Sequence, residues 1–151
     1  MKKRYWLAII FALIVCFIWG NSVLSSQLSS YLSMSVGELL ASIFGTGDGV
    51  TTVGGLSVRK MAHFTEFAAL GAVASLLFKR VLKNKGIYAL GLASCGVFVA
   101  LMDETIQIFS RRGSSVCDVW IDVFGYAVGC LIVTIICIIY TKLKNKNAHI
   151  E

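Results

Sequence analysis

Ionisable side chains interrupt three apolar stretches of this sequence, at spacings that would let them act together. Imidazole and carboxylate groups work as general acids and bases, whereas Lys and Arg side chains hold anions such as phosphate. We take as catalytic candidates His63, Glu66, Asp103, Glu104 and Asp118. As substrate-binding candidates we take Arg59, Lys60, Gln107, Arg111, Arg112 and Asp122.

The composition restricts where such residues can work. The chain has 151 residues, of which 57% are hydrophobic and only 15% charged, and its mean hydropathy is +0.79. Soluble domains average about 45–50% apolar and about 25% charged residues. We therefore exclude a soluble domain, and also a disordered chain or a disulfide scaffold.

Four apolar stretches are long enough to cross a bilayer, which takes about 20 residues. We predict an all-α, polytopic membrane protein forming one domain over residues 1–151, with spans at about 5–24, 56–82, 87–109 and 116–140. The first stretch is longer than the apolar core of a signal peptide, so an uncleaved anchor is expected. Apolar residues at three- and four-residue spacing predict an amphipathic, interfacial helix at about 28–44.

The net charge of +6 follows largely from membrane topology. Ten of the fourteen Lys and Arg residues flank the spans in three clusters, at 2–4, 79–85 and 142–146. The positive-inside rule places these clusters in the cytoplasm. Both termini are then cytoplasmic, and the basic residues face anionic membrane lipid, with no nucleic-acid partner expected.

The same topology places seven of the eight Asp and Glu residues outside or in the outer half of the membrane. At about 100° per residue, Lys60, His63 and Glu66 fall within about 120° on one helix face. Asp122, Gly125 and Gly129 share a narrow stripe on the fourth span, and glycines at this spacing let a neighbouring helix approach closely. We predict a polar pocket that opens outwards.

The charged residues could also have a purely structural role or bind a metal. The cations and acids could pair merely to hold four helices together, although buried ion pairs stabilise weakly. A metal held by His63, Glu66 and Asp103 or Asp118 is the second alternative, but no HExxH-type spacing is present. No metal or cofactor is therefore expected.

The motifs resemble those of the VanZ-like family, whose pattern is RKxxHFxEY, DExxQ, an Arg, and DxxxNxxG. The matching segments begin at Arg59, Asp103 and Asp118, with Arg111 or Arg112 between the last two. Phe67 stands in place of the usual Tyr, and Asp122 where Asn is common. The resemblance implies a small multi-pass protein of the bacterial plasma membrane, in a family associated with resistance to teicoplanin, a lipoglycopeptide antibiotic.

Three functions fit these observations. One is a hydrolase or transferase acting on a lipid-linked cell-wall precursor, with His63 as acid or base and Lys60 holding an anionic headgroup. A second is a protein that binds or shields a lipid or a lipoglycopeptide without chemistry. A third is a small proton-coupled transporter; it ranks last, because a charge-lined route through only four spans would require an oligomer.

Overall fold

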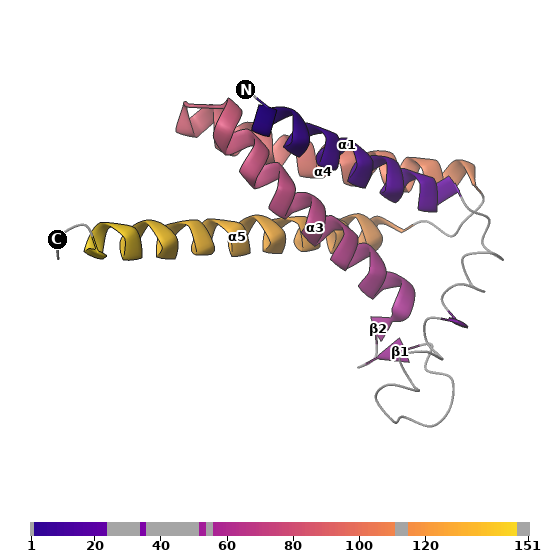
Figure 1. Ribbon diagram of the computed structural model, residues 1–151. Helices are drawn as coiled ribbons and strands as arrows, with labels where there is room; N and C mark the ends of the chain where they lie inside the picture. The colour runs from indigo at the N-terminus through magenta and orange to yellow at the C-terminus, as the bar shows by residue number, and fades with distance from the viewer. Residues whose placement is uncertain (1, 24–33, 36–51, 54–55, 111–114, 148–151) are drawn as a thin grey trace.

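The computed structural model describes residues 2–23, 34–35, 52–53, 56–110 and 115–147. It contains four long helices (Figure 1), which are α1 (Lys2–Val23), α3 (Val58–Val81), α4 (Lys85–Phe109) and α5 (Val116–Asn147). Each is long and apolar enough to cross a membrane. The prediction of an all-α protein with four membrane-spanning helices is confirmed. The predicted interfacial helix lies outside the described residues, apart from residues 34 and 35.

One small feature was not predicted. Just before α3, strand β1 (Thr52–Val53) pairs antiparallel with strand β2 (Leu56–Ser57), with Thr52 opposite Ser57. Between α3 and α4 the chain turns in three residues, and Asn84 caps α4 by accepting hydrogen bonds from the backbone N–H groups of Gly86 and Ile87. This cap satisfies donors that the first helical turn leaves open.

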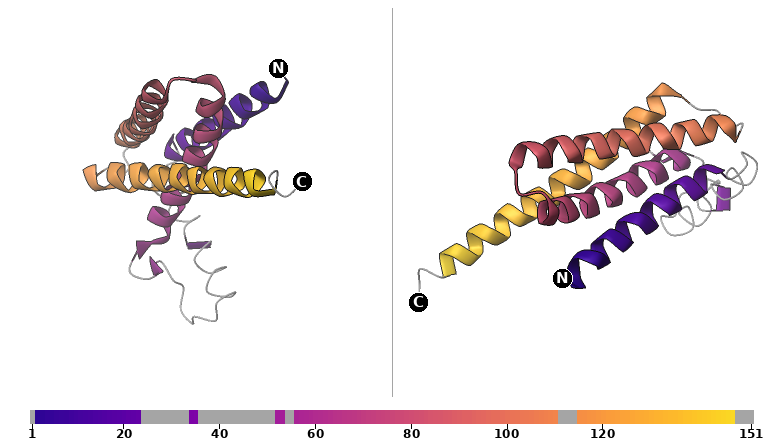
Figure 2. Two further views of the ribbon diagram at one scale, coloured as in Figure 1. Left: turned by 90° about the vertical axis from the view of Figure 1, so that its left-hand side faces the viewer. Right: turned by 90° about the horizontal axis from the view of Figure 1, so that it is seen from above.

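Helix α3 packs against each of the other three helices, and its contact with α5 is the most extensive in the bundle. Figure 2 shows α3 between α1 and α4, and Figure 1 shows α5 crossing α3. At this crossing Gly125 and Gly129 of α5 face the backbone of Phe64 and Ala68. The close approach that the glycine spacing predicts is confirmed.

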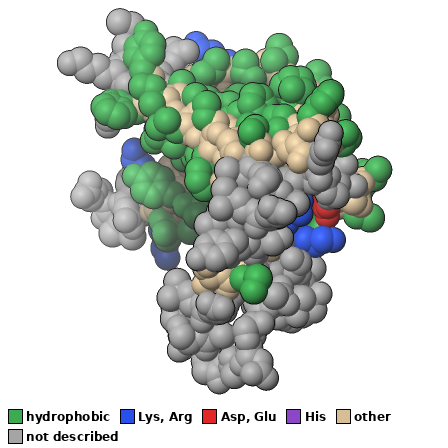
Figure 3. All heavy atoms as spheres, turned by 90° about the vertical axis from the view of Figure 1, so that its right-hand side faces the viewer, with side chains coloured by type: hydrophobic (Ala, Val, Ile, Leu, Met, Phe, Trp, Pro, Cys, Tyr) green, Lys and Arg blue, Asp and Glu red, His purple; other side chains and the backbone are tan. Residues whose placement is uncertain are grey.

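The distribution of polarity is the reverse of that in a soluble protein. Large apolar side chains lie on the outside, and Figure 3 shows a broad hydrophobic surface over the helices. More than half exposed are Trp6, Leu13, Phe98, Phe124 and Tyr140. Polar side chains occupy the interior, where at most 1% of each is exposed: Ser22, Asp103, Gln107 and Asp122. This arrangement suits a bundle surrounded by lipid.

The helices also differ in polarity between their two ends. Both termini and the α3–α4 turn lie toward the same end of the bundle (Figure 2). The opposite end brings together the end of α1, the start of α3, the end of α4 and the start of α5. These four helix ends carry the polar residues described below.

Candidate functional site

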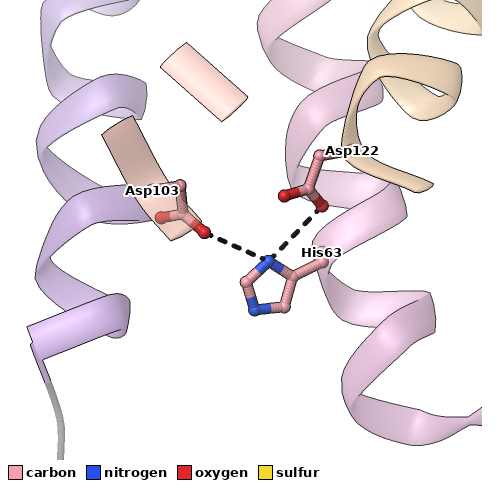
Figure 4. Close-up of side chains that lie close together, drawn as sticks. All are labelled: His63, Asp103 and Asp122. Atoms are coloured by element: carbon pink, nitrogen blue, oxygen red, sulfur yellow. Dashed lines mark ion pairs between the residues drawn. The ribbon is translucent and has the colours of Figure 1, made fainter. Parts of the chain in front are cut away.

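The centre of the site is a histidine between two buried aspartates from neighbouring helices. His63 of α3 places Nδ1 3.6 Å from Oδ2 of Asp103 on α4 and 3.5 Å from Oδ1 of Asp122 on α5 (Figure 4). The side chains of Asp103 and Asp122 are 0% and 1% exposed, and that of His63 is 13% exposed. Three helices thus each contribute one side chain to a site that is almost closed to solvent.

A chain of hydrogen bonds fixes Asp103. Its Oδ1 accepts from Ser22 Oγ on α1 at 2.5 Å, and its Oδ2 accepts from Gln107 Nε2 at 2.8 Å. Arg59 in turn donates from Nη2 to the Gln107 side-chain oxygen at 2.7 Å. Residues from two helices therefore hold the Asp103 carboxylate in one orientation. Through Gln107, the chain of hydrogen bonds extends to the Arg59 guanidinium at the start of α3.

Arg59 and Lys60 lie beside a cavity at this end of the bundle. Lys60 Nζ is 3.3 Å from Asp118 Oδ1, and both side chains are partly exposed. The cavity has a volume of about 220 Å³, and its lining consists of Arg59, Lys60, His63, Gln107, Asp118, Ile121 and Asp122. Six of the residues proposed from the sequence therefore line one space.

The remaining candidates have other positions. Glu66 Oε1 accepts a hydrogen bond from Asn21 Nδ2 on α1 at 3.0 Å, and Glu104 Oε1 accepts one from the Ser115 backbone N–H at 2.5 Å. Neither acid lines the cavity, and each joins its helix to a neighbouring segment. Arg111 and Arg112 lie outside the described residues.

Sequence reasoning missed the contribution of α1. Asn21 and Ser22 reach Glu66 and Asp103, although the first span showed no ionisable residue at this depth. The available signal was the pair of polar residues after Gly20, at the end of a long apolar stretch. Amides and hydroxyls at such a position are placed to satisfy buried carboxylates from other helices.

Two buried carboxylates face the single imidazole of His63. Within the described residues, neither carboxylate oxygen of Asp122 accepts a hydrogen bond. His63 can supply at most one positive charge to the two aspartates beside it. With both aspartates ionised, one negative charge beside His63 stays uncompensated, and an uncompensated buried charge costs several kcal/mol. Among the described residues, the group whose donor atoms are close enough to hold a metal ion is His63, Asp103 and Asp122.

Comparison with known proteins concerns the family of the chain and was made with family models, curated proteins and solved structures. No curated protein and no solved structure matches the chain. The family model described as VanZ/LLP1 matches residues 5–138, which include every residue of the site and nearly all of the four helices. A match over this much of the sequence establishes that the chain belongs to the VanZ/LLP1 family.

Proposed function

We propose that this membrane protein binds the anionic headgroup of an envelope lipid or lipid-linked cell-wall precursor in the cavity that residues of α3, α4 and α5 line. One observation carries the proposal: the guanidinium of Arg59, which lines the cavity, is hydrogen-bonded to the neutral amide of Gln107. A guanidinium held by an amide keeps its charge and several donors for a phosphate.

The surroundings of the cavity suit a ligand with an apolar tail. Trp120 and Phe124 of α5 are 69% and 65% exposed, close in sequence to the cavity residues Ile121 and Asp122. A headgroup in the cavity would leave its hydrocarbon chain beside this apolar surface. The basic clusters are at the opposite end, so the positive-inside rule turns the cavity toward the outer leaflet.

A binding measurement on the full chain in detergent tests the proposal. The probe is farnesyl diphosphate, which joins an anionic headgroup to a short apolar tail, and binding is followed by tryptophan fluorescence. Replacing Arg59→Gln should weaken binding about tenfold or more, since a charge-assisted hydrogen bond contributes about 1.5–3 kcal/mol.

The matched control is Lys83→Gln, which removes one positive charge at the opposite end of the bundle. Lys83 is exposed and lies in the α3–α4 turn. The control should bind the probe as the wild type does. An unchanged affinity in Arg59→Gln, or an equal loss in both variants, would contradict binding in this cavity.

A second candidate function is hydrolysis of the bound headgroup, which the position of His63 favours. A buried imidazole between two carboxylates can be oriented for proton transfer. With farnesyl diphosphate, water would add to the terminal phosphorus and the P–O–P bridge would break, giving farnesyl phosphate and inorganic phosphate. Phosphate release by the wild type and its loss in His63→Ala would support hydrolysis. If the wild type releases no phosphate, hydrolysis is contradicted and headgroup binding is the function that stays proposed.

The cellular consequence we propose is lowered susceptibility to teicoplanin-type lipoglycopeptides. The test uses a sensitive Gram-positive host that expresses wild type, His63→Ala or Asp118→Asn at matched membrane levels. Wild type should lower binding of fluorescent teicoplanin, and the variants should not. No effect of wild type would separate this protein from the resistance phenotype and direct attention to its effect on envelope lipids.

A further inference from the structure

The distances around His63 are longer than those of ordinary hydrogen bonds. N–H···O bonds in proteins measure about 2.7–3.2 Å between nitrogen and oxygen, whereas Nδ1 lies 3.6 Å from Asp103 and 3.5 Å from Asp122. The three donor atoms all lie within 4.8 Å of one another. Ligands at about 2.0–2.1 Å from a tetrahedral ion are about 3.4 Å apart, so the two distances from His63 to the aspartates resemble those in a coordination shell.

The charges of the same three residues also favour a cation. Asp103 and Asp122 are almost completely buried, and Figure 4 shows both carboxylates turned toward the same nitrogen of His63. Neither oxygen of Asp122 accepts a hydrogen bond from the described part of the chain. A dication between two carboxylates and a neutral imidazole would give a site without net charge.

The surroundings provide what a metal centre needs. Ser22 and Gln107 hold Asp103 by hydrogen bonds to its two oxygens, as outer groups orient metal ligands elsewhere. His63 and Asp122 line the cavity, so a fourth coordination position can open into it. Three protein ligands with one open position are typical of catalytic zinc sites.

The geometry points to a site for a divalent transition-metal ion, Zn²⁺ best of all, bound by His63 Nδ1, Asp103 and Asp122 beside the cavity. Imidazole together with carboxylates suits zinc better than calcium or magnesium, which prefer oxygen ligands alone. The site differs from the metal alternative drawn from the sequence, because Asp122 takes part and Glu66 does not.

The ion would deepen the headgroup proposal without depending on it. A cation beside Arg59 and Lys60 would add a third positively charged group to the cavity, which favours a phosphate there. His63 would then act as a ligand, and activation of water would belong to the ion rather than to the imidazole. Metal content and headgroup affinity are separate measurements, so one inference can fail while the other stands.

The test measures bound metal on the full chain in detergent. The protein is stripped with a chelator, incubated with Zn²⁺, freed of excess ion by gel filtration and analysed by mass spectrometry for zinc. Wild type should retain about one zinc per chain. Asp122→Asn preserves shape while weakening a ligand, and should lower zinc affinity about 100-fold or more, because loss of an outer-shell group alone costs about 10–100-fold.

The matched control is Glu104→Gln, the same chemical change on a buried acid next to Asp103. Glu104 accepts from the Ser115 backbone rather than facing His63, so zinc binding should be retained. Co²⁺ in place of Zn²⁺ should give the visible absorption of a tetrahedral site, lost in His63→Ala. If Asp122→Asn retains as much zinc as the wild type, the zinc is bound by the five free cysteines, and the proposed site is overturned. A wild type that retains no zinc would also overturn the site.

Discussion

The crossing of α3 and α5 offers a direct test of how the site is positioned. A Cβ added at Gly129 would lie 1.9 Å from the backbone carbonyl oxygen of Ala68. That oxygen belongs to the helix itself, so rotation of a side chain cannot relieve the overlap. We therefore predict that Gly129→Ala forces α5 away from α3.

The magnitude follows from the geometry. Ordinary van der Waals contact begins at 3.4 Å, so the two backbones must separate by about 1.5 Å at this point, and overpacking of this kind costs about 1–3 kcal/mol. Because only backbone can move, we expect the upper end, near 3 kcal/mol. For a chain of this length, each kcal/mol lowers the midpoint of thermal unfolding by about 2–4 °C.

The assay is a heat ramp on the full chain in detergent, followed by the fraction that stays monodisperse on size exclusion. Gly125→Ala should show a smaller loss than Gly129→Ala, since its Cβ would lie 2.5 Å from the Phe64 carbonyl oxygen. Gly20→Ala is the control, because nothing lies within 4 Å of its Cβ. It should be neutral or more stable by up to about 1 kcal/mol through helix propensity.

The ranking of the variants is what the reasoning depends on. A midpoint for Gly129→Ala within about 2 °C of the Gly20→Ala control would refute it. It would mean that the two helices do not meet through their backbones at this position. The placement of Asp122, two turns earlier on α5, would then not depend on the crossing at Gly129.

Two further predictions concern topology and the support of the site. Cys117 and Cys137 lie about 30 Å apart along α5; an impermeant thiol reagent added to whole cells should label Cys117 and spare Cys137, and the reverse pattern would invert the orientation. Gln107→Leu should destabilise the protein by about 1–3 kcal/mol, because Asp103 and Arg59 both lose a hydrogen-bond partner. Thermal unfolding in detergent measures this loss, and an unchanged midpoint would show that the amide is not a structural link.

Much of the architecture could be predicted from the sequence because the signals are local. The length and polarity of each apolar stretch determine that four helices can cross a membrane. Helical periodicity places Lys60 and His63 on one face of α3, and the glycine spacing on α5 predicts the close crossing that Gly129 makes. Hydropathy and the 3.6-residue repeat depend on neighbouring residues alone, so they can be evaluated without a fold.

The pairing of the site residues was decided only by the tertiary structure. Arg59 binds the amide of Gln107 rather than an acid, and Asp103 accepts one of its two hydrogen bonds from Ser22, which lies 81 residues away. The convergence of Asp103 and Asp122 on one nitrogen of His63 has no signature in the spacing of the sequence. Such contacts depend on which helices are neighbours and how each is rotated and shifted along its axis. Those variables are set by packing between distant segments, so no local pattern contains them.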